Sequence, residues 1–334
     1  MASERAETLP VLQKEGGERK GSDMTKRGAY AAISYMACAV LLLMFNKAAL
    51  SSYNFPCANV ITFFQILCSC TLLYALRRWK IISFTVGESH NISAGQSILV
   101  PYKTLVQTLP LAMSYLLYMI VTMESVRGIN VPMYTTLRRT TVAFTMIAEY
   151  LLTGQTHSPI VVGSVGMIIL GAVVAGARDL SFDTYSYAVV FIANICTAIY
   201  LAFIARIGKS SGLTTFGLMW CNGLVCGPIL LIWISIKGDI ETTLNFRYLY
   251  SLGFQCVMFL SCIMAFLINY FVFLNTTLNS ALTQTVCGNL KDVFSIGLGW
   301  FLFGGLPFDL FNILGQSLSF MGSGLYAYCK LHGK

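Results

Sequence analysis

Residues 283–300 read TQTVCGNLKDVFSIGLGW, a run in which Lys291 and Asp292 interrupt a segment otherwise apolar enough to cross a bilayer. An α-helix rises 1.5 Å per residue, so about 20 apolar residues span the ~30 Å of hydrocarbon. A charge at the bilayer centre costs roughly 2.5–3.5 kcal/mol on insertion scales. The stretch therefore predicts a membrane helix whose charged side chains face a polar interior rather than lipid.

The rest of the chain has the composition of a multi-pass membrane protein. Of its 334 residues 56% are hydrophobic and only 11% are charged, against about 25% charged residues in soluble domains. Ten apolar runs are long enough to cross a membrane: 29–50, 57–76, 104–123, 131–152, 159–177, 185–204, 213–235, 249–273, 279–302 and 307–328. We therefore expect an all-α membrane protein with ten transmembrane helices.

The basic residues predict how the chain is oriented. Residues 1–28 mix acids with bases and lack an apolar core, which indicates a disordered cytosolic tail rather than a cleaved signal or a transit peptide. With that tail in the cytosol, cytosolic segments hold 14 of the 22 Lys and Arg residues and the opposite side holds four. By the positive-inside rule, both termini, including the tail 329–334, are expected in the cytosol. This cytosolic excess accounts for the net charge of +8 without a nucleic-acid partner.

Weak internal similarity suggests two halves, 29–177 and 185–328. The stretch EYLLTGQ at 149–155 and the stretch GWFLFGG at 299–305 lie 150 positions apart. Each is followed by a glycine-rich helix, where small residues allow close packing in lipid. Five helices per half would make the second half an inverted copy of the first, an arrangement typical of transporters that bind substrate near the midplane.

Lys291 lies too deep in its predicted helix for its ammonium group to reach the membrane surface. Helical spacing places Gln284, Cys287, Gly288, Phe294 and Ser295 on its face. A cation, an amide, a hydroxyl and a glycine together suit an anionic, hydrogen-bonding ligand. The alternative is a structural ion pair between Lys291 and an acid of another helix, such as Glu149. Asp292 points about 100° away around the helix and is expected to support its neighbours rather than touch a ligand.

The first half has its own buried cations. Arg138 and Arg139 are adjacent, so we expect one to bind phosphate through its planar fork and the other to tie helices together. The sequence does not say which does which. Lys47, close to the end of the first helix, is a candidate for substrate contact or for a gate.

The run WCNG at 220–223 offers Trp220 as a stacking surface and Asn222 as an amide for a nucleobase or sugar. All three histidines fall outside the predicted spans, and the connections hold no metal-ligand cluster and no nucleophile with a base. These patterns predict no enzyme activity, no metal and no cofactor. The oligomeric state is left open, a homodimer included.

Several stretches together resemble one family. FNKAAL at 45–50, VPMYTTLRRTT at 131–141, WCNG at 220–223 and NSALTQTVCGNLKDV at 279–293 are similar to nucleotide-sugar transporters of the drug/metabolite transporter superfamily, over roughly residues 28–328. Among these, the plant Golgi UDP-N-acetylglucosamine transporters and their animal relatives are the most similar. The resemblance implies the drug/metabolite transporter fold and a Golgi or ER antiporter that exchanges cytosolic nucleotide-sugar for luminal nucleoside monophosphate.

The same resemblance implies site residues. The family's glycine-initiated phosphate motif falls on Gly288, Asn289 and Lys291, and its aromatic-asparagine motif falls on Trp220 and Asn222. GDP-mannose carriers instead have Gly-Ala-Leu-Asn-Lys and Phe-Tyr-Asn-Asn. Both departures favour uridine over guanine and leave the sugar undecided. The resemblance itself implies UDP-N-acetylglucosamine, exchanged for UMP.

Three alternatives stay open. One is a GDP-sugar antiporter, another is a phosphate-ester antiporter, and the third is a membrane receptor or scaffold that transports nothing. The C-terminus lacks the two spaced lysines of a simple ER retrieval signal, which favours the Golgi membrane.

Overall fold

The structure, a computed structural model, describes residues 24–86, 100–125, 131–176, 183–303 and 310–332. Twelve α-helices and one short π-helix make up the described part of the chain. The helices are α1 (Lys26–Lys47), η1 (Ala48–Ser52), α2 (Ala58–Arg78), α3 (Tyr102–Ser125), α4 (Val131–Arg138), α5 (Thr141–Thr153), α6 (Pro159–Gly176), α7 (Thr184–Ser210), α8 (Thr215–Ile236), α9 (Asp239–Leu244), α10 (Leu252–Leu278), α11 (Ala281–Phe303) and α12 (Leu310–His332).

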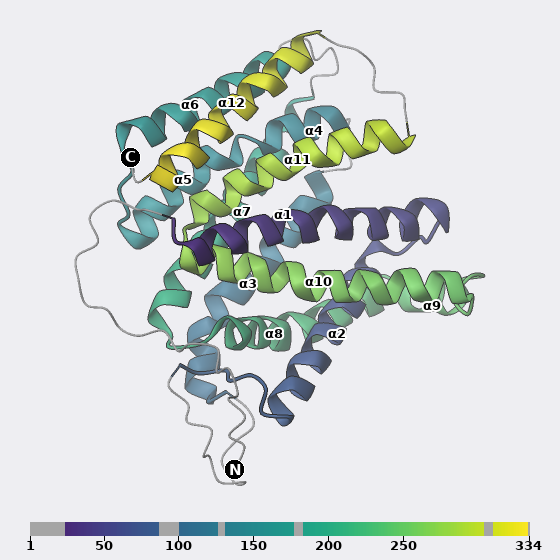
Figure 1. The fold of residues 1–334 in the computed structure, drawn as a ribbon. Coiled ribbons are helices and arrows are strands. Elements are labelled where there is room, and N and C mark those ends of the chain that lie inside the picture. The colour runs from purple at the N-terminus through teal and green to yellow at the C-terminus, as the bar shows by residue number, and fades with distance from the viewer. Residues whose placement is uncertain (1–23, 87–99, 126–130, 177–182, 304–309, 333–334) are drawn as a thin grey trace, which may run out of the picture.

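The helices form one bundle in which distant parts of the chain pack together (Figure 1). α12 lies along α6, α1 lies along α10, and α7 packs against both α3 and α5. α11 lies between α12 and α1 and also contacts α5. The helix with the buried lysine is thus surrounded by elements from both ends of the sequence.

Seven helices of the described residues are both long and apolar enough to cross a membrane, namely α1, α2, α3, α6, α7, α8 and α10. The chain is therefore an all-helical, multi-pass membrane protein. The other three predicted spans coincide with the pair α4 and α5, with α11 and with α12, which are not among those seven. α12 continues to His332, so residues 329–332 are helical where the sequence predicts a tail.

The predicted single span 131–152 is interrupted at Arg139 and Thr140, between α4 and α5. The backbone tightens there into i to i+3 hydrogen bonds, from Arg139 N to Thr136 O and from Thr140 N to Leu137 O. The hydroxyls of Thr140 and Thr141 donate to nearby carbonyls, at 2.8 Å to Leu137 O and 2.5 Å to Arg138 O. Threonine side chains that compete for backbone groups favour such interruptions.

Glycines bring α6 and α12 unusually close. A Cβ on Gly315 would lie 2.4 Å from Gly171 O and from Ala175 N, and one on Gly322 would lie 2.9 Å from Ser164 O. The close packing expected from the glycine-rich helices is confirmed at these positions. Gly163, in contrast, faces open space.

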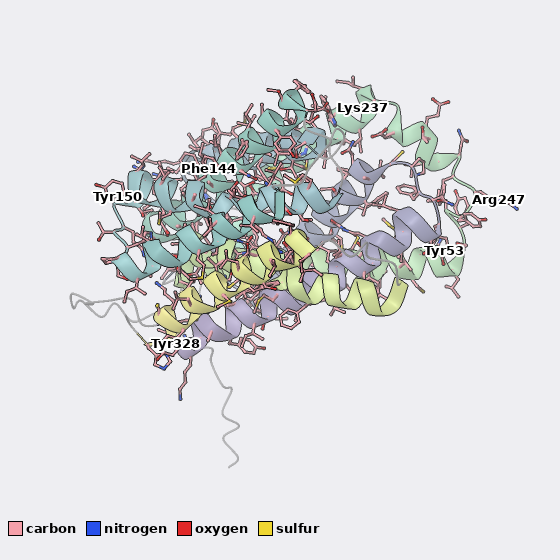
Figure 2. The ribbon with its side chains drawn as sticks, turned by 90° about the horizontal axis from the view of Figure 1, so that it is seen from above. Tyr53, Phe144, Tyr150, Lys237, Arg247 and Tyr328 are labelled. Atoms are coloured by element: carbon pink, nitrogen blue, oxygen red, sulfur yellow. The ribbon has the colours of Figure 1, made fainter. Side chains whose placement is uncertain are left out.

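The two ends of the described chain lie together at one end of the bundle, called the terminal end below. Met24 N donates to Lys330 O at 2.9 Å. Figure 2 places Tyr150 and Tyr328 toward this end and Tyr53 and Arg247 toward the opposite one. Connections predicted on opposite sides of the membrane thus lie at opposite ends of the molecule.

Candidate functional site

Lys291 and Asp292 form an ion pair in the middle of α11, with 2.9 Å between Lys291 Nζ and Asp292 Oδ1. Each side chain keeps 27% of its surface accessible, so the pair is not sealed. The alternative partner suggested by the sequence, Glu149, is wrong, because its carboxylate binds the backbone of Ala281 and Leu282 instead. The sequence predicts that Asp292 supports its neighbours, and in the structure it pairs with the adjacent lysine of its own helix.

Two tyrosines that the sequence reading missed lie near the lysine. Tyr35 of α1 and Tyr118 of α3 are close enough to influence its charge electrostatically. Gly288, one turn before Lys291, leaves room for the Tyr35 hydroxyl, which would lie 3.7 Å from a Cβ at that position. Isolated tyrosines inside apolar spans were the available signal for both residues.

The predicted polar face of α11 is only partly confirmed by the structure. Gln284 is buried and its Oε1 accepts from Asn275 Nδ2 at 2.6 Å, so its carbonyl serves helix packing. Phe294 is 60% exposed and lies on the outside, which corrects its placement on the face of Lys291. The side chain of Ser295 lies outside the described residues.

Asn289 is buried, and its Nδ2 finds no hydrogen-bond partner among the described residues. An unsatisfied buried donor costs roughly 1–3 kcal/mol, so such groups usually meet a water or a ligand. Two other buried donors without a partner also belong to predicted site residues, Arg139 Nε and Trp220 Nε1.

The two arginines diverge at the interruption between α4 and α5. Arg138 is half-buried and its Nη1 donates to Thr197 Oγ1 at 2.9 Å and to Asn194 Oδ1 at 3.3 Å, both on α7. Arg139 is buried and its Nη2 donates to Gln316 Oε1 of α12 at 2.7 Å. Both guanidinium groups contact neutral partners, and Arg139 lies within electrostatic range of Asp292.

Trp220 is packed within the hydrophobic core. Phe84 stacks on its ring at 5.4 Å between centroids, and Tyr74 lies at 6.5 Å. Its ring is 7% exposed, so it presents no free stacking face in this conformation. Phe84 is held there by the 83–86 segment, whose Val86 N donates to Gly212 O at 2.8 Å.

Asn222 lines a cavity of about 30 Å³ between α2, α3, α8 and α10. Tyr115 and Asn269 line it too. From there Tyr115, Tyr118 and Tyr200 form a continuous aromatic cluster, with Tyr118 and Tyr200 stacked at 5.6 Å. The cluster connects the amide of Asn222 to the surroundings of Lys291.

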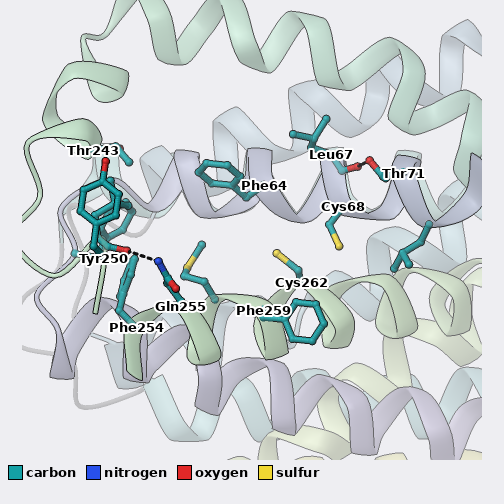
Figure 3. A pocket seen from close by; sticks show the side chains of 14 residues that line it. Phe64, Leu67, Cys68, Thr71, Thr243, Tyr250, Phe254, Gln255, Phe259 and Cys262 are labelled. Carbon is teal, nitrogen blue, oxygen red and sulfur yellow. Dashed lines mark hydrogen bonds between the residues drawn. The ribbon is translucent and has the colours of Figure 1, made fainter. Parts of the chain in front are cut away.

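Two further features bound the site. The side chain of Lys47, which ends α1, lies outside the described residues, so its predicted contact is untested. A groove of about 520 Å³ between α2 and α10 is apolar and lined by exposed side chains such as Phe64, Leu67 and Phe259 (Figure 3). No predicted site residue lines this groove.

The described residues hold no cluster of three or more His, Cys, Asp or Glu that could bind a metal.

The arrangement is suited to binding an anion. Lys291, Arg138 and Arg139 supply three cations, and Asp292 offsets one of them. The unpaired donors lie on α8, on α11 and between α4 and α5, and the tyrosine cluster lies on α3 and α7. A family model described as the triose-phosphate transporter family matches residues 26–327. This chain belongs to the triose-phosphate transporter family.

Relatives in this transporter family cover nearly the whole chain. The chain is 67% identical to the UDP-N-acetylglucosamine transporter UGNT1 of Arabidopsis thaliana, over 94% of this chain and 91% of the relative. It is 32% identical to the UDP-sugar transporter sqv-7 of Caenorhabditis elegans, over 91% and 89% of the two chains. The family and these relatives are transporters rather than enzymes, as the sequence predicts.

A more distant relative and a solved structure complete the comparison. The GDP-mannose transporter GONST2 of Arabidopsis thaliana is 27% identical over 70% of this chain and 61% of its own length. A crystal structure with 12% identity superposes with a TM-score of 0.63, over 93% of this chain and 98% of the other. That likeness shows a shared fold alone.

Proposed function

We propose that this protein carries a UDP-sugar, UDP-N-acetylglucosamine, from the cytosol into the Golgi lumen in exchange for UMP. The observation that carries the proposal is the 67% identity to a UDP-N-acetylglucosamine transporter across 94% of the chain. The shorter coverage of the GDP-mannose transporter, 70% of this chain, supports uridine over guanine as the base.

Charge balance supports an anionic diphosphate as the guest. Lys291, Arg138 and Arg139 together with Asp292 carry two net positive charges, which match the two negative charges of a UDP-sugar. In this structure Asp292 Oδ1 accepts from the ammonium of Lys291 at 2.9 Å. A diphosphate oxygen could then take the place of Asp292 on this ammonium. The hydrogen bonds of Arg138 and Arg139 to other described residues go to neutral side chains.

Each residue of the predicted site is assigned to a part of the substrate by its position in the structure. Lys291 and Arg138, which is half-buried, contact the diphosphate, while Arg139 ties α5 to α12. The unpaired amide of Asn289 and the close approach allowed by Gly288 serve the same end of the guest. Asn222 and the tyrosine cluster hold the base or the sugar. Gln284, Trp220 and Lys47 are kept as candidates that contact the guest in another conformation.

We further propose ten membrane spans in two inverted halves, residues 29–177 and 185–328. The helix contacts support this arrangement. If each span of the first half corresponds to the span five places later, α1 corresponds to α7 and α3 corresponds to α10. The contact of α1 with α10 then has its counterpart in the contact of α7 with α3. The same rule maps α5 with α7 onto α11 with α1, while α6 with α12 and α2 with α8 map onto themselves.

The compartment and orientation are part of the proposal. Both termini are placed in the cytosol, on the evidence of the basic residues in the predicted cytosolic connections. Met24 N donates to Lys330 O, so the two ends of the described chain lie together. This supports placing both termini on the same side of the membrane. Rocking of the two halves would then expose the site alternately to cytosol and lumen.

Exchange in proteoliposomes tests the function. Purified protein is reconstituted into vesicles loaded with UMP and offered labelled UDP-N-acetylglucosamine, UDP-galactose, GDP-mannose or a CMP-sugar. We expect uptake of UDP-N-acetylglucosamine that depends on internal UMP. Uptake that is equal without UMP overturns the antiport, preference for GDP-mannose overturns the base, and no uptake of any nucleotide-sugar rejects transport.

A further inference from the structure

A carboxylate with no role in the proposed substrate site lies at the terminal end of the bundle. Glu149, near the end of α5, is fully buried. Its Oε1 accepts from Ala281 N at 3.0 Å and its Oε2 accepts from Leu282 N at 3.2 Å. These are the first two backbone N–H groups of α11, which no intrahelical carbonyl can satisfy, at the end of the helix where the dipole favours an anion.

A second link joins the halves a few ångströms away. Asn279 Nδ2 donates to Gly28 O in the first turn of α1 at 3.0 Å and to Asn275 Oδ1 at 2.6 Å. Asn275 Nδ2 in turn donates to Gln284 Oε1 at 2.6 Å. The chain of amides therefore runs from the start of α1, through the end of α10, to the first turn of α11.

These contacts cross between the two halves of the chain. Gly28 and Glu149 belong to residues 24–176, whereas Asn279, Ala281 and Leu282 belong to residues 183–332. We call these five residues the terminal gate. Lys291 lies ten residues beyond Ala281 along α11, or about 15 Å at 1.5 Å per residue. A guest that enters from the terminal end has to pass the gate to reach Lys291.

We propose that the terminal gate is closed in this structure, and that Glu149 must release Ala281 and Leu282 before substrate can enter from the terminal end. The inference rests on the proposed transport function. The pairing suits reversible opening, because water can replace both partners. An exposed carboxylate and two exposed N–H groups each regain hydrogen bonds to solvent, so opening exchanges hydrogen bonds rather than orphaning them.

A purely structural cap makes a different prediction from a gate. A cap stays formed in every state of the transport cycle, so fixing it leaves exchange unchanged. A gate has to open once per cycle, so fixing it stops exchange while the protein stays folded.

The decisive experiment fixes the gate shut. A Cβ on Gly28 would lie 2.2 Å from Asn279 Oδ1, so the double variant Gly28→Cys with Asn279→Cys places two thiols within reach of each other. Copper-phenanthroline oxidises the pair and dithiothreitol reverses it, with cross-linking followed by protease fragments on gels. The two single-cysteine variants, treated in the same way, control for the native cysteines.

We expect the cross-linked protein to lose at least tenfold in UDP-N-acetylglucosamine exchange and to regain it on reduction. Exchange that continues at the uncross-linked rate overturns the gate. Failure of the two thiols to cross-link also overturns it, because the closed arrangement is then not populated.

Loosening the gate is the complementary test. Hydrogen–deuterium exchange of the peptide that begins at Ala281 is compared in the wild type, in Glu149→Gln and in the control Glu241→Gln, whose side chain is exposed on α9. We expect about tenfold faster exchange in Glu149→Gln alone, together with a changed KM for substrate added at the terminal end. The hydrogen–deuterium exchange measurement needs no transport. If the wild type carries no sugar, the proposed function is rejected, and this measurement still decides whether the gate opens.

Discussion

At the scale of single residues, the chemistry centres on Lys291 and its neighbour. An ammonium paired with an adjacent carboxylate is neutral as a unit but exchangeable, because 27% of each side chain stays accessible. The depth of Lys291 in the membrane stays a prediction, because α11 is not among the seven helices of the described residues that are long and apolar enough to cross a bilayer. The partner of Lys291 could not be predicted, because Asp292 and Glu149 were both acids within reach and only the packing of α5 on the start of α11 removes Glu149.

Replacing the lysine tests its role directly. We expect Lys291→Ala to lower UDP-N-acetylglucosamine exchange at least thirtyfold, because truncating one partner of a buried charge pair costs about 2–5 kcal/mol. Lys237→Ala, which removes an exposed lysine beside Trp233, is the matched control and should exchange normally. Normal exchange by a folded Lys291→Ala protein would make the lysine a structural partner only.

Replacing Asp292 should strengthen substrate binding, whereas replacing Lys291 should weaken it. Asp292→Asn removes the carboxylate that competes with the diphosphate for Lys291, so we expect a lower dissociation constant for UDP-N-acetylglucosamine. Isothermal titration with the purified protein in detergent measures it, and Glu241→Gln serves as the control. Weaker binding by Asp292→Asn would show that the carboxylate supports the site instead of competing for the lysine.

A third residue, His157, lies in the connection between α5 and α6. Burial, with a smaller repulsion from Lys330, lowers the pKa of its imidazole below the usual range. Just below pH 6.5 the imidazole is therefore protonated in the unfolded chain but stays neutral in the folded protein. We expect stability to fall as pH drops through about 6.5. His157→Gln should flatten this part of the melting-temperature profile between pH 8 and pH 5.5, and an unchanged profile would contradict the assignment.

At the scale of elements, a helix interruption and a non-local backbone pairing decide where the site residues point. The interruption between α4 and α5 directs Arg138 toward α7 and Arg139 toward α12. The sequence predicts that adjacent arginines diverge, but the turn that sorts them depends on threonine hydroxyls and on Asn194, which is far away in the chain. The core packing of Trp220 could not be predicted from the sequence for the same reason, since Phe84 reaches it through a non-local backbone pairing.

The packing of α6 on α12 can be tested through its glycines. In Gly315→Ala the new Cβ would meet backbone atoms at 2.4 Å, which cannot yield without separating the helices. We expect a loss of about 1–3 kcal/mol, as for other overpacked contacts. Gly163→Ala adds the same methyl group to open space on α6 and should be neutral or slightly stabilising. Fluorescence-detected size exclusion after heating compares the two, and equal melting would contradict the close approach.

At the scale of the whole molecule, helices from both ends of the chain pack into one bundle, in which we propose two inverted halves with the substrate site between them. The all-helical, multi-pass class and the family could be predicted because apolar run lengths and local motifs carry them. The terminal gate could not be, because it depends on which helix ends meet across the halves. A transporter that binds a dianion between rocking halves explains the positions of Lys291 and the arginines together.

A structure of the protein with UDP-N-acetylglucosamine bound tests this account most directly. The predicted result is a diphosphate oxygen within about 2.7–3.2 Å of Lys291 Nζ, a normal hydrogen-bond length, with Asp292 released from the lysine. A structure in which Lys291 still pairs with Asp292 while the diphosphate lies elsewhere would contradict it.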